Sequence, residues 1–206
     1  MSSKYPYESN LINLAKKEFI ENGRSKRFIE LEDEIINTCF FKDICEFAIV
    51  CKACDIKKIQ KSIDYKKGQE YPGGYYFLAK FVLGSDHKLL EKHFLQFCKS
   101  QNVISVDIVF SAVDFALNFN DANVNELFKI VLRSNLLPYE KCQIAIQMVH
   151  KHNSIDVSLF KKFISWCEKQ EGDNLFLAYI KKLKDRVEDI LESQECGSDI
   201  NIFPKY

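Results

Sequence analysis

The chain has 206 residues, of which 47% are hydrophobic and 28% charged, a balance typical of a folded globular protein. Its 29 basic and 29 acidic side chains cancel, which disfavours a protein that binds nucleic acid mainly by neutralising phosphates. With 7 glycines and 4 prolines the sequence offers few tight turns, so an all-β fold is disfavoured and helix is expected.

A repeat with a period near 33 residues organises the predicted helices. Six of the nine alanines are spaced by 33, 31, 33, 33 and 33 residues, at Ala15, Ala48, Ala79, Ala112, Ala145 and Ala178. Most positions three residues before each alanine, and three or four after it, are apolar and form one stripe of a helix. Each repeat therefore begins with a helix, helix A, whose alanine allows a neighbouring helix to approach closely.

A second helix, helix B, is predicted after each helix A. Its apolar stripe begins, in the six repeats, at Phe28, Ile56, Leu89, Val124, Val157 and Val187. Turn-forming residues precede it, and an N-cap is expected at Asp55, Asp86, Asp121 and Ser154 or Asp156. Residues 194–206, which contain Gly197 and Pro204, are predicted to form a C-terminal tail or a final cap.

Tandem helix–turn–helix units of this length are typical of an α-solenoid. The sequence therefore predicts an all-α fold, an α-solenoid of about six repeats in a single domain over residues 1–193. The unit resembles tetratricopeptide and pentatricopeptide repeats, which are similar in length, and Leu136-Leu137-Pro138 resembles the end of a pentatricopeptide unit. The Trp, Gly and Tyr positions of the tetratricopeptide pattern are absent, since the single tryptophan, Trp166, lies in helix B of the fifth repeat. The resemblance implies an architecture and does not carry a function with it.

The face of helix A opposite the alanine is polar in the first repeat and largely apolar in the second to fourth. The candidate partner-binding residues on this face are Ile49, Phe77, Lys80, Phe81, Phe110, Val113, Asp114 and Gln147. A helix that is apolar all round is buried on all sides. Two interpretations of what buries this face stay open. The residues either fill the core of a tight superhelix or line an apolar groove, edged by Lys80 and Asp114, that binds a partner helix or peptide.

Catalytic and metal-binding patterns are not found in the sequence. Cys51-Lys-Ala-Cys54 has the spacing of half a zinc site, but no second pair accompanies it, so reduced thiols packed in the core are expected. No His-Glu-x-x-His motif is present, and a run of carboxylates is interpreted as a solvated surface, at Glu30, Glu32, Asp33 and Glu34. We therefore expect a non-catalytic protein without cofactor or metal.

A helical-repeat scaffold or adaptor that binds a protein partner through the helix A face is the favoured function. The alternative is a pentatricopeptide-like protein that binds single-stranded RNA, indicated by aromatic and lysine residues in the segments 65–67 and 71–80. The end of the sixth repeat is apolar, at Phe176, Tyr179, Ile180 and Leu183. We expect the C-terminal tail or a second copy of the chain to cover these residues. Residues 1–10 show no secretory signal and no segment is apolar enough to cross a membrane, so a cytoplasmic or nuclear location is expected.

Overall fold

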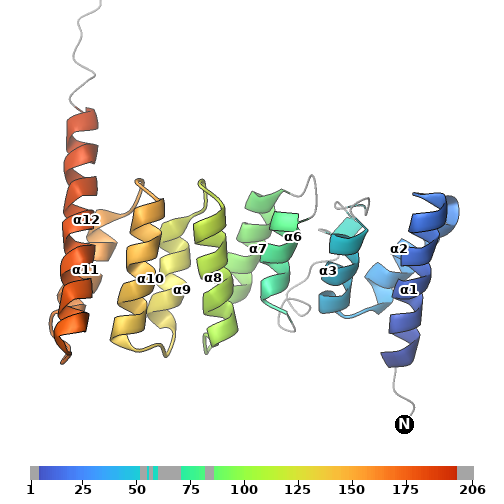
Figure 1. Cartoon of the computed structure of the whole chain (residues 1–206), viewed down its shortest axis with the longest axis horizontal. Helices are drawn as coiled ribbons and strands as arrows, with labels where there is room; N and C mark the ends of the chain where they lie inside the picture. Colours follow the sequence, from blue (N-terminus) through green and yellow to red (C-terminus); the bar gives the residue numbers. More distant parts are fainter. Residues whose placement is uncertain (1–4, 52–54, 56–57, 60–70, 82–85, 199–206) are drawn as a thin grey trace, which may run out of the picture. The chain divides into compact units, whose positions relative to one another are not determined.

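The computed structural model describes residues 5–51, 55, 58–59, 71–81 and 86–198 of the chain. Regular structure in these residues consists of helices alone, so the prediction of an all-α protein is confirmed for them (Figure 1). The chain divides into two compact units, unit 1 with residues 1–101 and unit 2 with residues 102–206.

Unit 1 is built by helices that pack in chain order around an aromatic core. Its described helices are α1 (Tyr5–Asn22), α2 (Lys26–Thr38), α3 (Phe41–Val50), α6 (Gly73–Phe81) and α7 (His87–Lys99). The fully buried ring of Phe28 in α2 lies 5.1 Å from Phe19 in α1 and 6.0 Å from Phe47 in α3. Tyr75 in α6 joins the next pair, with its ring 5.4 Å from Phe41 and 6.1 Å from Phe94.

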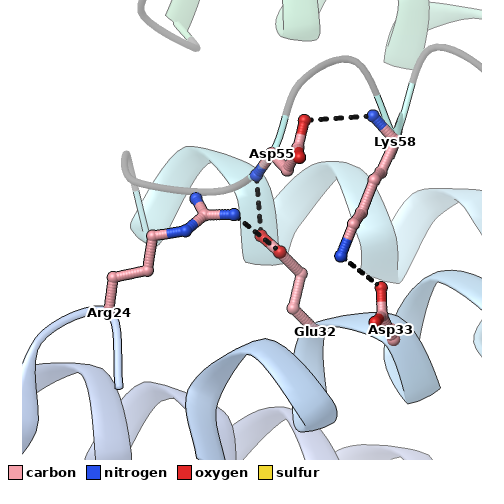
Figure 2. Close-up of polar contacts among 5 residues, drawn as sticks. All are labelled: Arg24, Glu32, Asp33, Asp55 and Lys58. Carbon is pink, nitrogen blue, oxygen red and sulfur yellow. Dashed lines mark hydrogen bonds and ion pairs between the residues drawn. The ribbon is translucent and has the colours of Figure 1, made fainter. Parts of the chain in front are cut away.

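A buried carboxylate connects α2 to the segment at Asp55 (Figure 2). Glu32 is fully buried; one carboxylate oxygen accepts a hydrogen bond from Arg24 at 3.1 Å, and the other accepts from the Asp55 N–H at 2.7 Å. Asp55 accepts in turn from the Lys58 N–H at 3.2 Å, and the Lys58 ammonium lies 2.7 Å from Asp33. The prediction that Glu32 is a solvated surface charge is wrong, because its face of α2 is covered and its carboxylate satisfies a backbone donor there.

Unit 2 consists of two helical layers. Its helices are α8 (Val106–Asn118), α9 (Val124–Arg133), α10 (Pro138–Lys151), α11 (Val157–Cys167) and α12 (Asn174–Ser198). Helices α8, α10 and α12 lie side by side, α10 packing against both neighbours, and we call them the A layer (Figure 1). Helices α9 and α11 pack behind them as the B layer, where the rings of Phe128 and Phe160 stack with their centroids 4.4 Å apart.

Capping side chains fix where most of these helices begin. The predicted N-caps Asp86 and Asp156 are confirmed, since each accepts a hydrogen bond from a backbone N–H in the first turn of α7 or α11. The prediction at Asp121 is wrong: the N-cap of α9 is Asn123, whose side chain accepts from the Glu126 N–H at 3.3 Å. The Ala122 N–H donates to the Phe119 carbonyl and forms a turn that includes Asp121. The helix therefore begins after Asn123 and not after Asp121.

The repeated alanines behave alike until the last one. Ala15, Ala48, Ala112 and Ala145 are fully buried and Ala79 is 9% exposed, whereas Ala178 is exposed. In α12 the buried stripe instead follows positions spaced by four and three residues, at Phe176, Ile180, Leu183, Val187 and Ile190. The helix pair predicted for the sixth repeat is thus one continuous helix, because residues 181–186 contain no glycine, proline or other residue that would end it.

The same helix changes the expectation for the end of the chain. Phe176, Ile180 and Leu183 are buried within unit 2 and Tyr179 is half-buried, so these residues do not form an exposed apolar end. The prediction of a second copy that covers them therefore loses its physical basis. Helix α12 continues to Ser198, so the first five residues of the predicted tail are helical.

Candidate protein-binding site

The structure places four of the eight candidate partner-binding residues in each unit. In unit 1, Ile49 and Phe77 are half-buried and Lys80 is exposed, with its ammonium 5.4 Å from the ring centre of Tyr76. The side chain of Phe81 lies outside the described part of the structure. In unit 2 the four residues belong to the A layer, where Val113 and Asp114 are half-buried and Gln147 and Phe110 are exposed.

Phe110 is the most exposed of the large apolar side chains in the A-layer helices. Its exposed fraction is 61%, although it lies in the middle of α8, between the buried residues Val109 and Ser111. Phe110 is therefore a surface residue of unit 2 and not part of its core. A phenylalanine exposed to this degree is the kind of side chain that a protein interface covers.

A pocket of about 400 Å³ lies between the beginnings of α10 and α12 in the same layer. Leu137, Tyr139 and Leu175 line it and remain between 42% and 58% exposed. Phe176 and Tyr179 form the apolar wall on the α12 side. Several large apolar side chains around one hollow are typical of a site that holds an apolar group of a partner.

Local interactions at the starts of α10 and α12 hold the residues on both sides of this pocket in place. Pro138 begins α10, and the Glu140 carboxylate accepts a hydrogen bond from the Leu137 N–H at 2.8 Å, which fixes Leu137 at the edge. Gly172 is needed on the opposite side, because a Cβ there would collide with the Phe176 ring. Asp173 accepts from the Phe176 N–H at 2.9 Å and so orders the beginning of α12.

The charged residues of the pocket are all acidic. Glu171 and Asp173 line it, and its lining residues include no lysine, arginine or histidine. The pocket therefore suits an apolar side chain that has a positively charged neighbour. The sequence pattern does not reveal this site, because Leu136-Leu137-Pro138 indicates only the end of a repeat unit and the other half of the pocket comes from residues 171–179.

Other chemistry is sparse in the residues that the structure describes. They contain no group of three or more His, Cys, Asp or Glu side chains that could hold a metal ion, and Cys54 of the Cys-x-x-Cys pair lies outside them. Six described cysteines are buried free thiols and Cys196 is exposed; burial raises the pKa of Cys45 well above its usual range. None of the described helices is long and apolar enough to cross a lipid bilayer. Residues 65–67 of the RNA-binding prediction also fall outside the described ranges.

The fold and the pocket define an all-α protein with an apolar site on one helical layer. Comparison with protein-family models, with curated proteins and with solved structures finds no match. Its function therefore has to be inferred from the geometry and charge of its own side chains.

Proposed function

We propose that the protein is a non-catalytic helical-repeat adaptor and that the A layer of unit 2 binds a protein partner. The observation that supports this proposal most strongly is the apolar pocket between α10 and α12, where Leu137, Tyr139 and Leu175 are exposed to solvent. Covering apolar surface contributes about 25 cal/mol per Å², so a partner side chain that fills this hollow would add substantially to binding.

The partner that fits is a segment with an aliphatic or aromatic anchor next to a lysine or arginine. The anchor would occupy the apolar pocket, and the basic residue would face Glu171 and Asp173. Phe110 on α8 supplies a second exposed apolar contact in the same layer. Binding energy in such interfaces is concentrated in a few aromatic and aliphatic anchors.

We also propose that the helices follow a tandem repeat of the α-solenoid kind. Within unit 2 the pairs α8–α9 and α10–α11 support it, because each pair carries a fully buried alanine at the same place, Ala112 or Ala145. In this proposal the counterpart of the binding face in unit 1 carries Ile49, Phe77, Lys80 and Phe81.

Two exposed leucines of α12 provide a matched test of the pocket. Leu175 lines the pocket and is 58% exposed, whereas Leu177 is 54% exposed and lies outside its lining. We expect Leu175→Asp to weaken the binding of a fluorescein-labelled peptide in which lysines alternate with leucines, because a hydrated carboxylate replaces the apolar contact that a leucine of the peptide needs in the pocket. Leu177→Asp should bind it as the wild type does. Fluorescence anisotropy measures both affinities.

Both substitutions replace exposed side chains, so the free energy of unfolding, measured by thermal denaturation, should stay within about 0.5 kcal/mol of the wild-type value. The proposal fails if Leu175→Asp and Leu177→Asp bind the basic peptide equally. It also fails if the peptide does not bind the wild-type protein at all.

A further inference from the structure

A second concave surface of unit 2 lies between α11 and α12 and differs in charge from the apolar pocket. The groove has a volume of about 660 Å³. Val157, Trp166 and Leu191 form its apolar part, and the lysines Lys161, Lys162 and Lys169 line the rest together with two serines. No carboxylate belongs to its lining residues.

The lysines of this groove form no ion pair among the residues that the structure describes. All three are exposed. Glu168, which precedes Lys169 in the sequence, lies 3.4 Å from Lys184 of α12. The lining of the groove therefore combines positive charge with an apolar surface, although the whole chain has no net charge.

Trp166 is held firmly at the centre of this surface. Its ring stacks on Phe163 at 5.7 Å, and the Lys141 ammonium lies 5.8 Å from the ring centre. Lys141 is itself buried and donates to the Leu132 carbonyl at 3.0 Å, and burial lowers its pKa. A ring fixed by these contacts loses little entropy when a ligand covers its 40% exposed surface.

A smaller hollow continues the surface on the other side of the tryptophan. It has a volume of about 290 Å³ and shares Trp166 and Lys162 with the groove. Leu132, Leu159 and Phe163 give it an apolar lining, and Lys141 is its second basic residue. An extended ligand that crosses α11 would thus meet apolar contacts and ammonium groups in turn.

We propose that this groove binds an acidic segment of another protein, in which aspartates or glutamates are interspersed with aliphatic residues. The carboxylates would pair with Lys161, Lys162 and Lys169, and the aliphatic side chains would cover Val157, Trp166 and Leu191. A single-stranded nucleic acid fits less well, because its bases need open aromatic faces. The groove offers one aromatic ring, which already stacks on Phe163.

Trp166 provides a direct readout, since it is the single tryptophan of the chain. We expect a short synthetic peptide of alternating glutamates and leucines to change the Trp166 emission of the full chain in a saturable manner. Lys161→Glu with Lys162→Glu should weaken this binding at least about tenfold, because like charges then face each other. The control is Lys181→Glu with Lys182→Glu, a lysine pair on α12 that is also exposed but does not line the groove, and it should bind as the wild type does.

Three results would overturn the inference. They are an emission that the peptide leaves unchanged, equal weakening by the two charge reversals, and a response to oligouridylate that exceeds the response to the peptide. If the double variant loses its far-UV helical signal, Lys169→Glu takes its place with the same expected direction. The basic peptide is expected to bind a different site, the apolar pocket. A negative result with the acidic peptide therefore does not contradict the proposed adaptor function, and a negative result with the basic peptide does not contradict the proposal for this groove.

Discussion

At the scale of single residues, Glu32 joins three parts of unit 1: Arg24 before α2, α2 itself and the segment at Asp55. We expect Glu32→Ala to lower the free energy of unfolding by about 2–4 kcal/mol, because it removes the buried carboxylate that accepts from a partly buried N–H and from a guanidinium. Urea unfolding followed by far-UV circular dichroism measures the change.

Glu30 provides the matched control on the same helix. Its ion pair with Arg27, at 3.5 Å, is exposed at both side chains. Glu30→Ala should therefore change the stability by less than about 0.5 kcal/mol. Equal losses from the two substitutions would show that the burial of Glu32 has no energetic consequence.

At the scale of helices, we expect the buried alanines to lie where neighbouring helices approach closely. Ala145 of α10 is fully buried and Ala178 of α12 is exposed, although both occupy the same position in successive sequence repeats. We expect Ala145→Leu to destabilise unit 2 by about 1–3 kcal/mol through overpacking. Ala178→Leu should change its stability by less than about 0.5 kcal/mol.

Trp166 emission during urea unfolding reports on unit 2 and measures both substitutions. The assignment of Ala145 to a close helix contact would be wrong if Ala145→Leu were tolerated as well as Ala178→Leu. It would also be wrong if the exposed position were the sensitive one.

The helical character of the chain and the N-caps of α7 and α11 could be predicted because they depend on short-range chemistry. The alanine stripe identified the buried side of the first five A helices, and Asp86 and Asp156 act as N-caps where expected. The sixth repeat could not be predicted correctly, since its alanine continues the spacing while the buried stripe of α12 runs through Phe176, Ile180 and Leu183.

The candidate sites were less predictable than the helices. Phe110 was identified from its place opposite an alanine, and it is exposed as a binding residue must be. The pocket at Leu137 and Leu175 brings together the starts of two helices that are far apart in the sequence. The burial of Glu32 likewise depends on Asp55, which is 23 residues away, so no local pattern contains it.

At the scale of the whole molecule, the two proposed sites would allow unit 2 to hold two partners, as the proposed adaptor function requires. The apolar pocket of the A layer has acidic neighbours, and the groove on α11 has basic ones. Two partners with opposite charge would each be rejected by the site of the other, because like charges in an interface cost several kcal/mol. Both sites belong to unit 2, so unit 1 is not required for this selectivity.

Leucine-methyl and tryptophan-indole NMR spectra of the full chain, titrated with the basic and the acidic peptide, test this account most directly. The basic peptide should shift the methyl signals of Leu137 and Leu175 and leave the Trp166 indole unchanged. The acidic peptide should shift the Trp166 indole and the Leu191 methyls and leave Leu175 unchanged, while Leu177 responds to neither. Shifts of the same signals by both peptides, or of Leu177 as strongly as Leu175, would contradict the account.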